Sequence, residues 1–154
     1  MRSVNVVASR VIAAPAHVVY ELIADYRTGH PTILPPQYFE DLVVEEGGRG
    51  AGTRIRFTMK SFGTKRISRA NVTEPDPGRL LVETDIETGT TTRFIVEPLG
   101  NVKTRVTFDT VFPTPGLRGW LQSWLVPGYL RKVYDVELKQ LERRALEVSE
   151  RGHM

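Results

Sequence analysis

His30 is the residue best suited to transfer a proton. It lies in a loop rich in proline and glycine, with Tyr26 before it and Tyr38 after it. An imidazole titrates near neutral pH, and with a phenol nearby it could serve aldol cyclisation or dehydration, which need proton transfers at carbons next to carbonyls. The alternative is a solvent-exposed loop histidine. His30 and Tyr26 are therefore candidate acid–base residues, with both interpretations open.

Arg131 is the second candidate because it is the only charged residue on the apolar face of a predicted C-terminal helix. In a straight helix Arg131 faces the interior, where a guanidinium could bind the carboxylate or enolate oxygen of a ligand. In a helix kinked at Pro127, Leu130 and Val133 join Tyr134 in the core and Arg131 turns to solvent. Both arrangements fit the sequence.

Other kinds of site find little support in the sequence. The chain has no cysteine, and its histidines, His17, His30 and His153, have no partner four residues away, so we expect no metal site. A glycine-rich segment at 47–52 is followed by an alternating strand pattern, whereas a phosphate-binding loop needs a helix N-terminus there. No cofactor is therefore expected.

A long C-terminal helix is predicted over residues 117–148, because apolar residues recur there at spacings of three and four. One helix cannot bury such a stripe alone, so the rest of the chain must supply an apolar surface. The stripe consists of Leu117, Trp120, Trp124, Pro127, Arg131, Tyr134, Leu138, Leu141, Ala145 and Val148.

The first part of this helix, residues 117–126, is apolar on more than one face. This half-helix could simply pack over the rim of a sheet. Alternatively, its surplus apolar side is a lid that moves for ligand entry, a surface that touches a membrane, or a dimer contact.

The preceding residues predict two short helices and seven strands. The first strand is expected at 4–12, a helix at 15–26 that opens with a proline, and one further helical turn at 32–34. Because the turns between the last five strands are short, neighbouring strands must be antiparallel. The remaining strands are expected at 38–46, 53–60, 65–73, 79–87, 91–98 and 102–112.

Alternation along the strands assigns a face to each side chain. Glu83, Asp85 and Glu87 fall on the outward face, where they could pair with a run of basic residues between 49 and 69. Such pairing explains the basic run without a nucleic-acid partner. The inward face is expected to hold Ile55, Phe57, Met59, Ala70, Val72, Leu80, Val82, Ile86, Phe94, Val96, Val106, Phe108 and Phe112, with Ser68, Thr84 and Thr110 as small polar groups.

Several local sequences occur in a familiar order. Ala14-Pro15 opens a helix that ends at Asp25, Gly-Ala-Gly-Thr-Arg at 50–54 leads into a strand, and Glu-Pro-Asp-Pro-Gly-Arg-Leu at 74–80 forms a turn. With the long C-terminal helix, this order resembles the START-like superfamily, especially its polyketide cyclase/dehydrase and lipid transport (SRPBCC) branch, over essentially the whole chain. The resemblance implies an α+β helix-grip fold, in which a seven-stranded curved antiparallel sheet wraps around a long kinked C-terminal helix, with two short helices after the first strand.

The resemblance also implies a deep apolar cavity between sheet and helix that binds lipids, polyketides or related molecules. Binding or transport of a hydrophobic small molecule is therefore the expected function. One alternative is a polyketide cyclase or dehydrase with proton-transfer residues at the cavity mouth, and another is docking to a membrane or partner through residues 117–126. The expected ligand-binding residues are Tyr38, Phe57, Met59, Val72, Val82, Thr84, Phe94, Val106, Phe108, Thr110, Trp120, Trp124 and Tyr134.

The length of 154 residues fits one domain, expected over residues 1–150, with a disordered tail at 151–154. No apolar run approaches the roughly 18 residues of a transmembrane helix, and residues 1–15 lack the apolar region of a signal peptide. The absence of cysteine agrees with a cytoplasmic location, which is the expected compartment.

Overall fold

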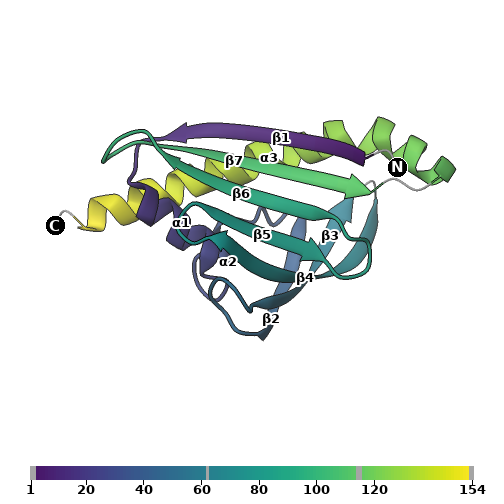
Figure 1. The fold of residues 1–154 in the computed structure, drawn as a ribbon, viewed down its shortest axis with the longest axis horizontal. Helices are drawn as coiled ribbons and strands as arrows, with labels where there is room; N and C mark the ends of the chain where they lie inside the picture. Colours follow the sequence, from purple (N-terminus) through teal and green to yellow (C-terminus); the bar gives the residue numbers. More distant parts are fainter. Residues whose placement is uncertain (1–2, 62, 114–115, 153–154) are drawn as a thin grey trace.

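The computed structural model describes residues 3–61, 63–113 and 116–152 (Figure 1). Within these ranges the strands form one antiparallel sheet in the order β1-β7-β6-β5-β4-β3-β2. The elements are, in chain order, β1 (Ser3–Ile12), α1 (Ala16–Ala24), α2 (His30–Ile33), β2 (Phe39–Glu46), β3 (Arg54–Ser61), β4 (Thr64–Asp76), β5 (Leu80–Asp85), β6 (Thr91–Pro98), β7 (Thr104–Pro113) and α3 (Gly116–Gly152).

The predicted helix-grip fold is confirmed. Figure 1 shows the sheet curving from β1 at the top of the view to β2 at the bottom, with α3 running behind β1 and β7. α3 also contacts the short helices α1 and α2. It is helical across Pro127 and ends at Gly152, beyond the predicted domain end at residue 150. Within the described residues, no helix is long and apolar enough to cross a bilayer.

The core lies between the concave face of the sheet and α3. α1 adds Val19, Leu22 and Ile23 to the same core. Removing each such large side chain from water stabilises the fold by about 1.5–3 kcal/mol. The sheet contributes Val6, Ile12, Ile55, Val72, Leu81, Phe94, Val96, Val106 and Phe108, and α3 contributes Leu130, Val133, Tyr134, Leu138, Leu141 and Ala145.

Arg131 lies on the outer face of α3. Its side chain is exposed, whereas Leu130 and Val133 are buried with Tyr134. This is the arrangement predicted for a helix whose phase changes at Pro127. Arg131 therefore does not reach the interior, and the interpretation in which it binds a ligand oxygen there does not fit the structure.

β5 turns a different face to the core from the one expected. Leu81 is fully buried and lies opposite Phe94 of β6. Glu83 lies opposite Val72 of β4, and Val72 is also buried. Because cross-strand partners share a face of a sheet, Leu81 and Glu83 point to the concave side.

The predicted inward positions of Leu80, Val82, Thr84 and Ile86 are therefore wrong. Thr84 is exposed and half of Ile86 is exposed. The strand begins with apolar residues at consecutive positions, Leu80 to Val82, so alternation alone could not decide which set is buried. Pairing with the neighbouring strands decides it, and Val82 and Thr84 lie on the convex face, away from any ligand between sheet and helix.

The basic residues of β3 and β4 pair mainly with acids of β2. Arg66 approaches Asp85 of β5 at 4.0 Å, but Asp85 lies opposite the buried Ala70 and so shares the concave side with Glu83. The expected pairing on the outward face is therefore wrong for both acids. Ion pairs on the outer face are thus local links between neighbouring strands. They join Lys60 to Glu40 (3.2 Å), Lys65 to Glu40 (2.9 Å), Arg69 to Glu45 (2.9 Å) and Arg54 to Glu46 (2.9 Å).

Candidate functional site

Two rings at the end of α1 and the start of α2 stack beneath the sheet. The ring centroids of Tyr26 and His30 are 4.4 Å apart, and the side chains are 1% and 3% exposed. His30 Nδ1 lies 2.7 Å from the carbonyl oxygen of Ile23. Because a carbonyl only accepts hydrogen bonds, Nδ1 carries a proton, and in the neutral ring Nε2 keeps its lone pair. The alternative of an exposed loop histidine is therefore wrong.

Glu83 reaches these two rings from β5. The Tyr26 hydroxyl donates a hydrogen bond to Glu83 Oε2, and the same oxygen lies 3.8 Å from His30 Nε2. Burial raises the pKa of Tyr26 well above its ordinary value, and the negative charge of Glu83 raises it further. Tyr26 is thus a neutral donor, and Glu83 is its acceptor.

Glu137 faces this group from α3. Its side chain is 3% exposed, and among the described residues it has no hydrogen-bond or ion-pair partner. Burial raises the pKa of Glu137 well above 4.5, and the charge of Glu83 acts in the same direction. Both effects favour the protonated form of Glu137. We call Tyr26, His30, Glu83 and Glu137 the polar cluster.

Aromatic rings and hydroxyl groups continue from the polar cluster across the concave face. His30 meets Phe94 edge to face at 5.9 Å, Phe94 meets Phe108 at 4.8 Å, and Phe108 meets Tyr134 at 5.5 Å. The Tyr134 hydroxyl is hydrogen-bonded to Thr110. The polar cluster therefore lies beside a largely apolar wall.

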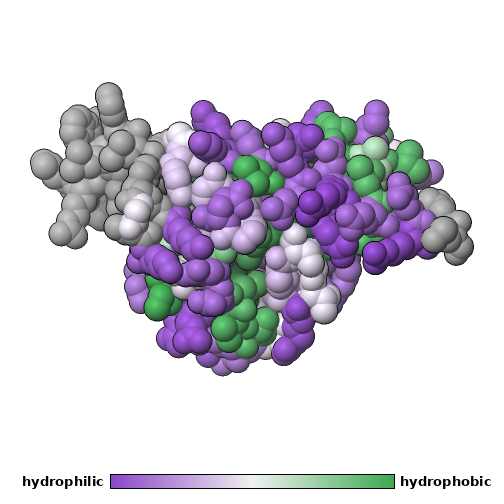
Figure 2. Space-filling model, turned by 180° about the vertical axis from the view of Figure 1, so that it is seen from behind, coloured by the Kyte–Doolittle hydropathy of each residue, from purple (hydrophilic) through white to green (hydrophobic). Residues whose placement is uncertain are grey.

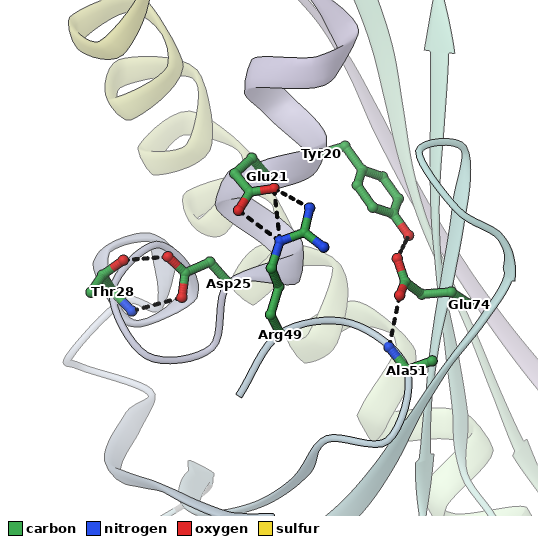
Figure 3. Close-up of polar contacts among 7 residues, drawn as sticks. All are labelled: Tyr20, Glu21, Asp25, Thr28, Arg49, Ala51 and Glu74. Carbon is green, nitrogen blue, oxygen red and sulfur yellow. Dashed lines mark hydrogen bonds and ion pairs between the residues drawn. The ribbon is translucent and has the colours of Figure 1, made fainter. Parts of the chain in front are cut away.

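A glycine-rich loop between β2 and β3 holds the end of α1 in place. The Tyr26 amide donates to the Gly48 carbonyl at 2.9 Å, and the Gly50 amide donates to the Ala24 carbonyl at 2.9 Å. Arg49 pairs with Glu21 of α1 (Figure 3). The loop thus positions the backbone of Tyr26, which carries the stacked ring.

Glu74 of β4 ties this loop to α1. Figure 3 shows its two carboxylate oxygens between Tyr20 and the loop: the Tyr20 hydroxyl donates to Oε2 at 2.6 Å and the Ala51 amide donates to Oε1 at 2.7 Å. A Cβ atom on Gly50, whose φ is +62°, would lie 2.0 Å from Glu74 Oε1. A larger residue at this position would have to displace the Glu74 carboxylate.

Two open hollows lie on the outer surface, away from the polar cluster. One, of about 530 Å³, is lined by residues of α2, β2 and α3, including Leu34, Phe39 and Arg143. The other, of about 640 Å³, lies between α1 and the end of α3, beside Leu22 and Val148. Seen from behind, hydrophilic residues cover most of the described surface, and apolar residues show in separate patches (Figure 2). Neither hollow includes a residue of the polar cluster.

The structure brings several of the predicted site residues together. Phe94, Phe108, Thr110 and Tyr134 line the concave face beside the polar cluster, and Val72 and Val106 are buried in the same face. Their role in ligand binding stays a prediction.

Other predicted residues lie farther away or outside the described part. Tyr38, Phe57 and Met59 are partly buried at the β2–β3 end of the sheet. The side chains of Trp120 and Trp124 lie outside the described residues. Within the described residues, no three potential ligands come together to hold a metal ion.

Sequence reasoning missed Glu83 and Glu137. The three consecutive apolar residues at the start of β5 leave its face undecided, and alternation from Leu80 predicts the outward face for Glu83. Glu137 lies three residues after Tyr134 and four before Leu141, so its position on the buried stripe could have been found from spacing. Charged helix residues usually face solvent, so the sequence alone favours an exposed position for Glu137.

Comparison with known sequences identifies the family. Residues 3–146 match the family described as polyketide cyclase / dehydrase and lipid transport. The chain belongs to this family. No curated protein sequence matches it.

Solved structures of similar proteins share the fold. The KanY protein is 26% identical, with a TM-score of 0.81 over 94% of this chain and 99% of that one. A Thermus thermophilus protein is also 26% identical, with a TM-score of 0.73 and the same coverage. A START superfamily protein from Mycobacterium smegmatis, 17% identical, has a TM-score of 0.73 over 94% and 98% of the two chains. The family resemblance seen in the sequence is thereby confirmed.

Replacing Gly50 tests how the loop is held. Gly50→Ala and Gly52→Ala both place a Cβ on a backbone with positive φ, but only Gly50 faces Glu74, whereas Gly52 faces open space. Gly50→Ala should reduce the free energy of unfolding by about 1–3 kcal/mol more than Gly52→Ala, because it displaces a hydrogen-bonded carboxylate. Urea denaturation measures both values. Equal losses would contradict the assigned role of Glu74.

The raised pKa of Glu137 makes stability depend on pH. The folded state binds this proton more tightly than the unfolded state, so the stabilisation is present below pH 4.5 and is lost as pH rises through the folded-state pKa. Glu137→Gln cannot lose a proton. Above pH 4.5 its free energy of unfolding should therefore rise relative to wild type, by up to about 1.4 kcal/mol per pH unit until the folded-state pKa is reached.

Urea denaturation between acid and alkaline pH measures this difference, and exposed Glu150 on the same helix provides the control, Glu150→Gln. Parallel stability curves for wild type and Glu137→Gln would show that Glu137 has no perturbed titration.

Proposed function

We propose that the protein binds a hydrophobic small molecule, such as a lipid or a polyketide, between the concave face of the sheet and α3. The family to which the chain belongs supports hydrophobic ligand binding or cyclase activity in general terms. The observation that carries the proposal is the polar cluster itself: three buried polar side chains and the partly buried Glu83, gathered beside a wall of apolar and aromatic side chains.

Stability alone gives no reason for such a cluster. An unpaired polar group in an apolar interior costs about 1–3 kcal/mol, and Glu137 has no partner among the described residues. An apolar side chain at that position of α3 would avoid the cost. Buried groups with perturbed pKa values in an otherwise apolar site are typical of places that bind or transform a ligand.

The proposed ligand lies with its apolar body against Phe94, Phe108 and Val106 and its polar end at the polar cluster. The hydroxyl of Tyr26 and the carboxyl of Glu137 can donate hydrogen bonds, and Glu83 can accept them. The site thus offers apolar area for affinity and a few polar groups for orientation.

A larger side chain on the concave face should compete with the ligand. Val72 lies opposite Glu83 and is 2% exposed, whereas its neighbour Thr73 is exposed on the convex face. Val72→Phe should weaken binding of an apolar fluorescent probe such as Nile red by about tenfold or more, because it fills part of the binding space. Thr73→Phe should bind as wild type does.

Fluorescence titration measures both affinities, and thermal denaturation checks that each variant is folded. Absence of probe binding to the wild type, or equal binding by the two variants, would overturn the proposed site.

A cyclase or dehydrase is the second candidate, and the stacking of Tyr26 with His30 beside Glu83 favours it. His30 Nε2 would remove a proton from a carbon next to a carbonyl, and Glu83 would stabilise the imidazolium that forms. Glu137 would donate its proton to the carbonyl oxygen, which gives an enol and balances the transfer. The enol carbon is then able to attack a second carbonyl.

Turnover of a poly-β-ketone substrate distinguishes this candidate from simple binding. His30→Gln should lower kcat by about 10²–10⁴-fold if His30 is the base. The exposed histidine of α1 supplies the control, because His17→Gln should leave kcat unchanged. If the purified protein shows no turnover, or if both variants keep full activity, the enzyme proposal fails and the binding proposal stands on its own.

Docking to a membrane or partner through residues 117–126 stays a prediction from the sequence. The side chains of this half-helix lie outside the described residues.

A further inference from the structure

The polar cluster holds two acids and no cationic partner for Glu137. Among the described residues, the only charge that acts on the pKa of Glu137 is that of Glu83. Arg10 of β1 points toward α3, but its guanidinium pairs with Glu142 at 2.9 Å. The interior between β5 and α3 is therefore acidic once both carboxyl groups ionise.

The groups near Glu137 come from the α1–α2 segment, from β5 to β7 and from α3 itself. Apart from the imidazole of His30, these groups are neutral or acidic. The α1–α2 segment supplies Tyr26 and, stacked on it, His30, β5 supplies Glu83, and α3 itself supplies Tyr134. The inward side chains of β6 and β7 near them are Thr92, Phe94, Phe108 and Thr110. Among these groups His30 has the only basic side chain, and its Nε2 lies 3.8 Å from Glu83 Oε2.

An unpartnered buried carboxyl group needs either a proton or a cation from outside the protein. The aromatic side chains beside the polar cluster favour an organic cation over a metal ion. The ring faces of Phe94, Phe108 and Tyr134 can attract an organic cation, and the rings can pack against its apolar body. A metal ion would need more oxygen or nitrogen ligands than the cluster offers.

We propose that this site binds organic ammonium ions, with the basic nitrogen held between the carboxyl groups of Glu83 and Glu137 and the apolar body against the aromatic side chains. The inference rests on the proposed function and narrows its ligand class to hydrophobic amines. A protonated amine donates hydrogen bonds to both carboxylates and supplies the charge that the cluster lacks. An anionic ligand would instead be repelled by Glu83.

When an ammonium ligand binds, it replaces the proton on the Glu137 carboxyl group. Glu137 gives up its proton to solvent, and the ammonium group takes the place of that proton beside the carboxylate. Proton release on binding therefore separates an ammonium ligand from a neutral one, which would leave Glu137 protonated as its hydrogen-bond donor.

A pair of ligands that differ only in the polar group provides the test. 2-(2-Naphthyl)ethylamine, which is protonated at pH 7, and 2-(2-naphthyl)ethanol have the same apolar body. Isothermal titration calorimetry should show that the amine binds wild-type protein about 10- to 100-fold more tightly than the alcohol, as expected for a charge-assisted hydrogen bond. The heat of amine binding should differ between phosphate and Tris buffers, because a proton is released.

Glu137→Gln should remove the preference for the amine and the proton release, while affinity for the alcohol stays within about twofold of wild type. Glu83→Gln should lower amine affinity as well, and it carries the test if Glu137→Gln does not fold. Glu150→Gln, at an exposed position of the same helix, should behave as wild type.

Equal binding of amine and alcohol to wild type would overturn the ammonium proposal and leave hydrophobic ligand binding intact. An amine preference that persists in both Glu137→Gln and Glu83→Gln would also overturn it. If neither compound binds, both the ammonium proposal and the proposed function fail.

Discussion

The hydrogen bond from Tyr26 to Glu83 connects the two layers of the molecule. A carboxylate on the concave face of a sheet must be satisfied, because an unmet buried acceptor costs more than most single contacts contribute. Tyr26 satisfies it, and the glycine-rich loop holds the Tyr26 backbone through Gly48. His30 then stacks on the same ring. The inward face of β5, the end of α1 and the start of α2 are thus fixed by one interaction.

Glu137 gives the site its chemical character. α3 could have closed the core with apolar residues alone, as it does at Leu138 and Leu141, yet it brings a second carboxyl group toward Glu83. Two acids in one apolar interior repel each other when ionised, and this repulsion together with burial raises the pKa of Glu137. The arrangement costs stability as pH rises. The same arrangement places a proton donor, Glu137, and a proton acceptor, Glu83, beside apolar side chains. A site that binds a ligand or transfers a proton requires such groups.

Local sequence patterns predicted most of the fold and only part of the site. The strands from β3 to β7 followed from alternation and short turns, and β6 begins and ends where the sequence placed it. β5 was assigned to the wrong face because Leu80, Leu81 and Val82 are all apolar, and only pairing with Phe94 distinguishes them. The contact between Tyr26 and Glu83 spans 57 positions in the sequence, so no local pattern reveals it. The chemistry of an imidazole beside two tyrosines points to His30, whereas the sequence alone favours an exposed position for Glu137, because charged helix residues usually face solvent.

Ligand-induced changes at the carboxyl groups of Glu83 and Glu137 test the proposed site most directly. In protein labelled with ¹³C at the side-chain carboxyl carbon of glutamate, an apolar ligand can be titrated while each glutamate signal is followed by NMR. Binding between the sheet and α3 should shift the Glu83 and Glu137 signals together and to saturation, while the signal of exposed Glu150 stays in place. A ligand that saturates the protein but leaves the Glu83 and Glu137 signals unchanged would contradict the placement of the site at the polar cluster.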